Sequence, residues 1–211
     1  MGVYSIVAYN MKKTVRILFY LLIIQSFVSC KSNYSESELK ANFSTEQQSD
    51  LNEIRQFFLN QVCESDFKLC YEQTNHDSLQ ASGNGFWTKI DFNEQKKLYE
   101  RISKSTFNEV WMICKSVNYK TKEEKKSICA NAIGKYQNYL SDLGKNNPRI
   151  AKYAERIQAS GDFGGLDISY WNVLTDKKHF DLNDPNIQLI LAIHYLSLND
   201  QDKRNENWAE K

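Results

Sequence analysis

The chain has 211 residues and a formal net charge of +1 at pH 7, with 27 basic and 26 acidic side chains. Balanced charge gives no electrostatic attraction to nucleic acid or to anionic lipid, so we expect no nucleic-acid partner. Only 2 prolines and 8 glycines are present. That scarcity is more typical of a helical domain than of an all-β one, whose turns are rich in both residues.

The first thirty residues have the three-part layout of a bacterial export signal. A basic region over residues 12–16 precedes an apolar run over 17–24, and the segment ends at Cys30. The run is too short to cross a bilayer as a helix, which needs about 20 residues. Met11 directly precedes the basic region, so we expect it to be the true initiator.

The residues before Cys30 resemble the lipobox of bacterial lipoproteins, in which an aliphatic residue and small residues precede a cysteine. Val28 and Ser29 fit the pattern, whereas Phe27 stands where leucine is usual. The resemblance implies a signal peptide over residues 1–29, lipidation of Cys30, cleavage before it and acylation of its new amino group. Several acyl chains hold a protein firmly on a lipid bilayer, where a single chain binds only marginally.

The resemblance places the protein in the bacterial cell envelope, anchored in a membrane through acylated Cys30. Lys31 is not the aspartate that would argue for inner-membrane retention, so we expect the outer membrane, on its periplasmic side or at the cell surface. An ordinary secretory signal and an uncleaved anchor are the alternatives. Polar residues fill positions 30–44 without periodicity and predict a flexible spacer. A single domain over residues 45–211 is expected to follow.

Helical periodicity begins at Ser44, which can form a capping box with Gln47. Further helices are expected over residues 67–79 and 91–102. Residues 86–90 lie between them and form the one expected extended segment.

The middle of the chain predicts two helices joined by a polar turn, over residues 106–117 and 121–143. The first carries apolar side chains at offsets of 0, 3, 4 and 7 from Phe107. The second carries an apolar stripe that includes Ile133, and Gly144 ends it.

Pro148 opens the next helix at its first position, and Gly161 ends it. A short helix is expected over residues 166–174. Pro185 opens the last helix, whose residues 186–198 are apolar around most of the circumference, as in a helix surrounded by others. The sequence therefore predicts an all-α fold, an irregular bundle of about six to eight helices with at most one short extended segment.

Beyond the lipobox the chain has four cysteines, an even number that favours disulfides in an exported protein. Cys114 and Cys129 lie at similar distances from the predicted turn, so they should face each other across a helical hairpin. Cys63 then pairs with Cys70 by elimination. That bond requires a break in the helix, because seven residues of continuous helix would separate them by about 10.5 Å. Reduced core cysteines are the alternative.

No motif of catalytic chemistry or of metal binding stands out, and we expect neither a metal nor a cofactor. His194 lies on the apolar face of the last helix and is predicted to be a hydrogen-bonded core residue. His76 and His179 lie in polar stretches and are predicted to face water.

Two aromatic pairs follow glycine-rich turns and are our candidates for contact with a partner: Phe86 with Trp87, and Tyr170 with Trp171. Filling of the core is the alternative use. The leading hypothesis is a non-enzymatic binding module, such as an inhibitor or immunity-like protein, whose partner is another envelope or secreted protein.

The rival hypothesis is an envelope enzyme whose site is assembled only in the fold. Two convergent carboxylates or a His–Asp pair in a deep cleft would favour the enzyme. A shallow apolar patch ringed by polar residues would favour binding.

Lipidation is tested by metabolic labelling with a fatty-acid analogue. The wild type should incorporate the label and Cys30→Ala should not, because the variant lacks the sulfur that accepts the lipid. Equal labelling of the two chains would contradict the lipoprotein assignment.

Overall fold

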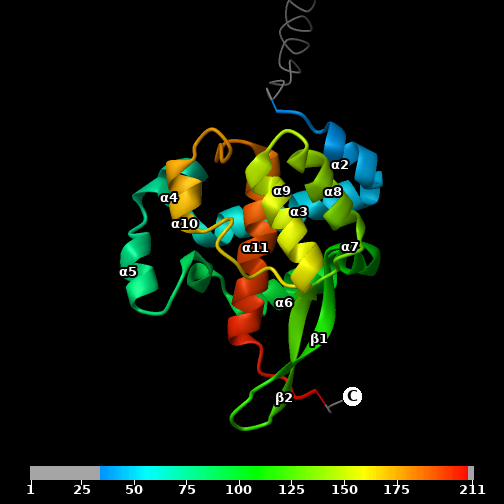
Figure 1. Ribbon diagram of the computed structural model, residues 1–211, viewed down its shortest axis with the longest axis vertical. Helices are drawn as coiled ribbons and strands as arrows, with labels where there is room; N and C mark the ends of the chain where they lie inside the picture. The colour runs from blue at the N-terminus through cyan, green and yellow to red at the C-terminus, as the bar shows by residue number, and fades with distance from the viewer. Residues whose placement is uncertain (1–33, 209–211) are drawn as a thin grey trace, which may run out of the picture. The chain divides into compact units, whose positions relative to one another are not determined.

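A computed structural model describes residues 34–208, so the predicted signal peptide, Met11 and Cys30 lie outside the described residues. From Glu36 onward the described chain belongs to one compact unit, which is mostly helical and carries a small two-stranded sheet (Figure 1). The predicted helical character is confirmed, whereas the sheet departs from an all-α fold. No helix among residues 34–208 is both long and apolar enough to span a membrane.

The described residues contain more helices than the six to eight predicted. The elements in chain order are α2 (Ser37–Asn42), α3 (Thr45–Val62), α4 (Phe67–Gln73), α5 (His76–Ala81), the 3-10 helix η1 (Phe86–Lys89), α6 (Phe92–Arg101), α7 (Lys104–Val110), β1 (Trp111–Val117), β2 (Glu124–Ala130), α8 (Lys135–Gly144), α9 (Pro148–Ser160), α10 (Tyr170–Thr175) and α11 (Pro185–Lys203).

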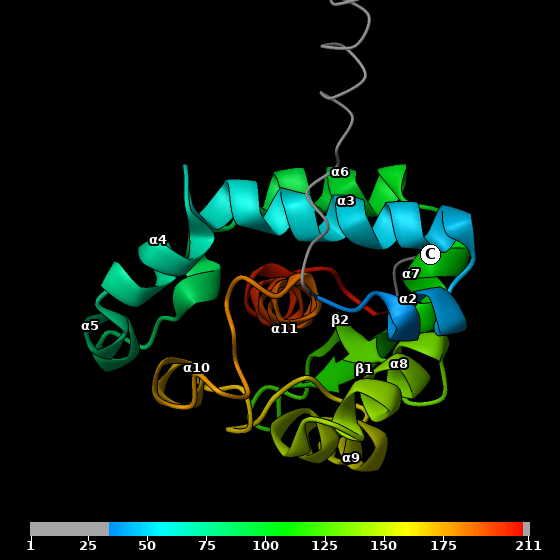
Figure 2. The ribbon, with the colours of Figure 1, turned by 90° about the horizontal axis from the view of Figure 1, so that it is seen from above.

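Helix α11 lies in the middle of the unit, with α3 and α6 on one side and α8, α9 and α10 on the other (Figure 2). Of its 19 residues, 13 are buried, including nearly every residue from Ile187 to Leu196. The predicted central helix is therefore confirmed. Each fully buried leucine or isoleucine contributes about 1.5–3 kcal/mol of transfer free energy. The buried side chains of α11 therefore make a large contribution to the stability of the core.

Local capping signals set several helix ends as predicted. The Ser44 side chain accepts from the Gln47 backbone amide, and the Gln47 side chain accepts in return from Ser44. Pro148 occupies the first turn of α9, and Gly161 ends that helix with a φ of +66°, in the left-handed region. Glycine adopts this region without the steric cost that a Cβ would impose.

Residues 111–130 form a β-hairpin, which corrects the prediction of two helices there. β1 and β2 are antiparallel, with Trp111 opposite Ala130 and Val117 opposite Glu124. The apolar offsets from Phe107 end with α7 at Val110, and the following segment is rich in aromatic and β-branched residues that favour strands.

Ile133 was predicted to lie on a buried helical stripe. It is instead 92% exposed, in the loop before α8.

The structure joins Cys63 to Cys70 and Cys114 to Cys129, the same two pairs that the sequence favoured. The first bond spans the break between α3 and α4, as its spacing required. The second links β1 to β2, so these cysteines face each other across a β-hairpin and not across the predicted helical one.

Three further segments differ from prediction. Residues 67–79 form two helices, α4 and α5, because the chain leaves the helix at Thr74 and the Asn75 side chain caps the next one. The expected extended segment 86–90 is the 3-10 helix η1. The predicted short helix 166–174 begins only at residue 170, as α10.

The expected flexible spacer, residues 30–44, contains folded structure in its described part. Ser37–Asn42 is helix α2, and Phe43 is buried. Asn42 Nδ2 donates to Asp142 Oδ2 at 2.8 Å and ties α2 to α8. Folded structure therefore begins before residue 45.

A buried ion pair closes the C-terminal end of α11. Arg204 donates to both carboxylate oxygens of Asp200 at 2.7 Å, and the Asp200 side chain is fully buried. Arg204 also pairs with the partly exposed Glu206 at 2.7 Å. Loss of the Asp200 charge therefore leaves Arg204 only partly compensated, at a cost near the lower end of the roughly 3–5 kcal/mol typical of broken buried pairs.

We therefore expect Asp200→Asn, which removes the charge at nearly constant shape, to lower the free energy of unfolding by about 3 kcal/mol. Chemical denaturation measures this loss. The control is Glu94→Gln, which breaks the exposed pair with Lys97 and should leave the midpoint unchanged. Equal effects of the two substitutions would contradict a special role for the buried pair.

Candidate functional site

A pocket of about 370 Å³ lies between α5, η1, the loop before α10 and α11. It brings together both aromatic pairs that the sequence singled out. The lining residues are His76, Leu79, Gln80, Asn84, Gly85, Phe86, Trp87, Gly165, Leu166, Ile168, Ser169, Tyr170, Trp171, His194, Tyr195 and Leu198.

Buried rings from three elements form the floor of the pocket. Tyr195 of α11 lies with its ring centroid 5.6 Å from Phe86, and Phe86 lies 5.4 Å from His76. The Tyr195 hydroxyl shares a 2.6 Å hydrogen bond with the hydroxyl of Tyr71 on α4. His76 Nε2 forms a 2.9 Å hydrogen bond with the backbone oxygen of Tyr71. These contacts fix the floor to the core.

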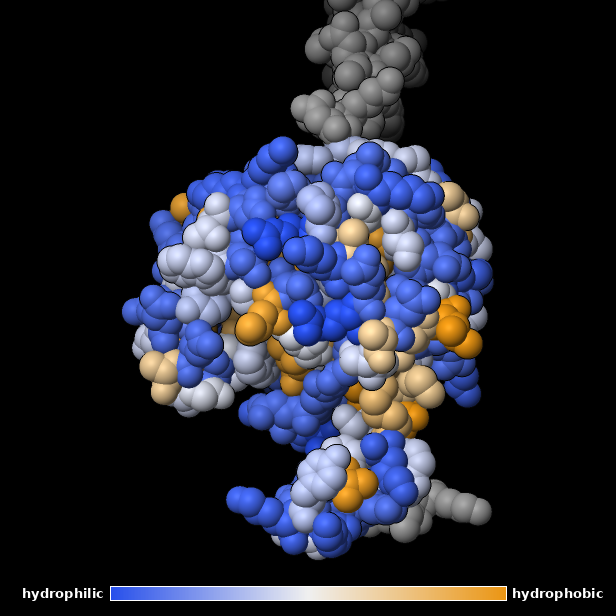
Figure 3. All heavy atoms as spheres, in the orientation of Figure 1, coloured by the Kyte–Doolittle hydropathy of each residue, from blue (hydrophilic) through white to orange (hydrophobic). Residues whose placement is uncertain are grey.

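The rim of the pocket is more exposed. Trp171 is 62% exposed and Leu166 is 76% exposed. Between rim and floor, the Tyr170 ring stacks on His76 with centroids 5.1 Å apart and planes within 3°. In the space-filling view, pale and orange atoms gather in the area of α5, α10 and α11, bordered by hydrophilic atoms (Figure 3).

Trp87 is held in place by a glycine. A Cβ atom at Gly85 would lie 1.7 Å from the Trp87 ring, so only glycine lets this indole approach the backbone so closely. The Trp87 ring in turn stacks beside Tyr195, with centroids 6.5 Å apart. A side chain at position 85 would therefore move one wall of the pocket.

The pocket lining is electrically neutral at neutral pH. No aspartate, glutamate, lysine or arginine lines it. Burial lowers the pKa of His194 to about 4, against the opposing effect of its hydrogen bond with the Phe163 backbone. Burial also lowers the pKa of His76. Both imidazoles are therefore uncharged above pH 7.

Of the two histidines that line the pocket, one confirms the sequence prediction and the other contradicts it. His194 is buried and its Nδ1 lies 3.2 Å from the Tyr153 hydroxyl, which confirms a hydrogen-bonded core histidine that also lines the pocket. His76 is only 5% exposed, so the prediction that it faces water is wrong. The rings of Phe86 and Tyr170 bury the His76 ring. Tyr170 lies nearly a hundred residues further along the chain, so the sequence near His76 gave no sign of this contact.

Sequence analysis missed the rest of the lining. Tyr195 and Leu198 lie on the apolar last helix and gave no signal of their own. Leu166 had one usable signal, an apolar residue that directly follows Gly164 and Gly165 in a turn.

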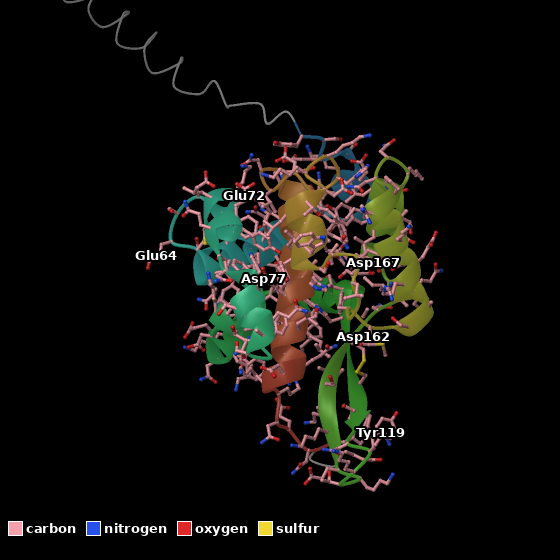
Figure 4. All side chains as sticks on the ribbon, turned by 60° about the vertical axis from the view of Figure 1, so that its left-hand side comes forward. Glu64, Glu72, Asp77, Tyr119, Asp162 and Asp167 are labelled. Atoms are coloured by element: carbon pink, nitrogen blue, oxygen red, sulfur yellow. A yellow bond between two sulfur atoms is a disulfide. The ribbon has the colours of Figure 1, made fainter. Side chains whose placement is uncertain are left out.

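The carboxylates around the pocket do not converge. Figure 4 labels Asp77, Asp162 and Asp167, and each has a separate partner. Asp77 accepts a 2.5 Å hydrogen bond from the Tyr170 hydroxyl, Asp162 accepts from Gln201 Nε2 at 2.7 Å, and Asp167 pairs with Arg156. No group of three or more potential metal ligands occurs within residues 34–208.

A His–Asp pair is present, but it is outside the pocket lining. His179 Nδ1 lies 2.8 Å from Asp176 Oδ1, and the other oxygen of Asp176 accepts from Arg149 Nε at 2.8 Å. This local contact between neighbouring residues links the segment after α10 to α9.

Comparison with protein families, with curated proteins and with solved structures finds no match to this chain.

The lowered pKa of His194 makes stability depend on pH. The unfolded chain binds a proton near pH 6.5, whereas folded His194 binds it only near pH 4, so stability is complete above 6.5 and falls as the pH drops toward 4. The shift corresponds to about 3 kcal/mol.

Denaturation of wild type and His194→Gln at pH 7 and pH 4.5 tests this dependence. The glutamine variant should lose less stability on acidification than the wild type does. Equal losses would show that His194 is not held neutral by the fold.

Proposed function

We propose that the protein is a non-enzymatic binding module of the bacterial envelope, anchored through acylated Cys30. Its aromatic pocket holds an apolar or aromatic group of another envelope or secreted protein. An inhibitor or immunity-like protein would bind its target in this way. The observation that carries the proposal is the neutral pocket in which both aromatic pairs meet, with Trp171 exposed at its rim.

The chemistry of the lining supports binding. Ligand sites are typically concave, mostly apolar and of about 300–1,000 Å³, with a few polar groups that orient the ligand. Here the polar groups are neutral amides and hydroxyls, those of Gln80, Asn84 and Ser169. A charged ligand group would lose its hydration without gaining an ionic partner, so the lining favours an uncharged one.

The exposed rim supports a protein partner. Tryptophan and tyrosine dominate the binding energy of protein interfaces, because they bury large areas at a small cost in conformational entropy. Trp171 and Leu166 leave most of their surface in water. A partner that covers them while inserting a side chain between Trp87 and Tyr170 would bury both rim and floor.

The rival enzymatic function lacks a comparable observation. In the pocket, both imidazoles are neutral and hydrogen-bonded to the backbone or to tyrosine. The His179–Asp176 pair shares its carboxylate with Arg149 and does not line the pocket.

Capture from envelope extracts with the full, membrane-tethered chain tests the proposal. Trp171→Ala should reduce recovery of the captured protein at least tenfold, because the partner would cover this exposed indole and loss of one such aromatic anchor costs about 1.4 kcal/mol or more. Gly85→Ala should have a similar effect by displacing Trp87.

The matched control is Trp208→Ala. Trp208 is also partly exposed, at 39%, but it does not line the pocket. Recovery with this variant should equal that with the wild type. A uniform loss with all three variants, or no loss with any, would contradict a specific role of the pocket.

A further inference from the structure

The β-hairpin extends away from the helices, and its two edges differ (Figure 1). At the turn, the Asn118 amide donates to the Glu123 oxygen at 2.9 Å, which fixes the alternation of hydrogen bonds along the ladder. In an antiparallel pair, every second residue directs its N–H and C=O toward the partner strand and the others direct theirs outward. From this register, the outward residues of β1 after its first residue are those opposite Ile128, Lys126 and Glu124.

The outer edge of β2 is covered by the chain itself. The Lys126 amide donates to the Glu206 oxygen at 2.8 Å, and the Trp208 amide donates to the Glu124 oxygen at 3.0 Å. Nearer the base, the Ala130 amide donates to the Gly161 oxygen at 2.9 Å. The C-terminal segment thus pairs with β2 as a short third strand.

The outer edge of β1 has no such cover. Beyond Trp111, whose amide donates to the Phe107 oxygen, its outward residues are Ile113, Lys115 and Val117. Their outward backbone groups have no hydrogen-bond partner among residues 34–208. Ile113 is 42% exposed and Val117 is 37% exposed. An open strand edge with apolar side chains is a template for pairing with another strand.

The open edge of β1 could pair with a second copy of this chain or with a strand of another protein, and charge favours the second. Lys115 is the middle one of the three outward residues, so a second copy paired antiparallel in the symmetric register would place two Lys115 side chains opposite each other. Lys115 already lies opposite Lys126 of β2, so a second Lys115 would add a third cation to this row, and like charges directly opposite are destabilising. An acidic residue at that position would instead join Lys115 and its 2.8 Å partner Glu124 in one network.

The tip of the hairpin adds to the same preference. Lys120 and Lys122 form no ion pair among the described residues, and Tyr119 beside them is 85% exposed (Figure 4). These cations lie at the end of the open edge. They would attract an acidic chain that runs along this edge.

We propose that the open edge of β1 binds an extended, acidic segment of a partner protein as an added β-strand. Its backbone pairs with Ile113, Lys115 and Val117. Its side chains follow the order apolar, any, acidic, any, apolar, with the acidic residue opposite Lys115. This surface is separate from the aromatic pocket, because no hairpin residue lines that pocket.

The test uses the full chain in detergent micelles and amide hydrogen exchange. The probe is the capped peptide Thr-Val-Thr-Glu-Thr-Val-Thr, and the matched peptide carries Lys in place of Glu. The acidic peptide should slow exchange at Lys115 and Val117 at least fivefold, and the basic peptide should not. No slowing at millimolar peptide, or equal slowing by both peptides, would overturn the proposal.

Two variants separate backbone pairing from charge. Lys115→Pro removes an outward N–H that the β1–β2 ladder does not use, so it should abolish the slowing at Val117 while the Cys114–Cys129 bond still forms. Lys115→Glu should exchange the preference, so that the basic peptide binds better. Slowing that depends on protein concentration without peptide would identify a second copy as the occupant and overturn the proposal.

Discussion

The structure depends on the burial of α11. A helix that is apolar on all sides is stable in water only when other elements surround it, and here helices from both halves of the chain do so. His194 and Tyr195 lie in its middle, so the floor of the aromatic pocket is a part of the core surface that the covering helices leave open. The floor is rigid for the same reason that the core is, and the pocket is largely formed before any ligand arrives.

The polar groups near the C-terminal end of α11 define where the other elements attach. Trp111 Nε1 at the base of β1 donates to Ser197 Oγ at 2.8 Å, and Asn199 Nδ2 donates to Gln95 Oε1 on α6 at 2.8 Å. A buried polar group without a hydrogen-bond partner costs free energy, so arrangements of these elements that break either hydrogen bond are disfavoured. The base of the hairpin is therefore fixed, while its far end extends into solvent.

Much of the fold was predictable because its signals are local. Capping by Ser44, Pro148 at a first turn and Gly161 at a helix end each depend on a few neighbouring residues. The hairpin was not predictable by periodicity, because the apolar offsets of the short helix α7 run into Trp111 and imitate a longer helix. The two aromatic pairs were recognisable from their glycine turns, yet their meeting with His76 and Tyr195 depends on contacts across about a hundred residues.

The two disulfides cross-link segments that lead to the two proposed binding surfaces. Cys63–Cys70 spans the break before α4, the helix that carries Tyr71 and leads into the α5 wall of the pocket. Cys114–Cys129 crosses the hairpin, most of whose far end is exposed. A disulfide stabilises mainly by restricting the unfolded chain. Both proposed binding surfaces therefore include an element that a disulfide cross-links, and disulfides persist in the oxidising compartments to which a predicted export signal would direct the chain.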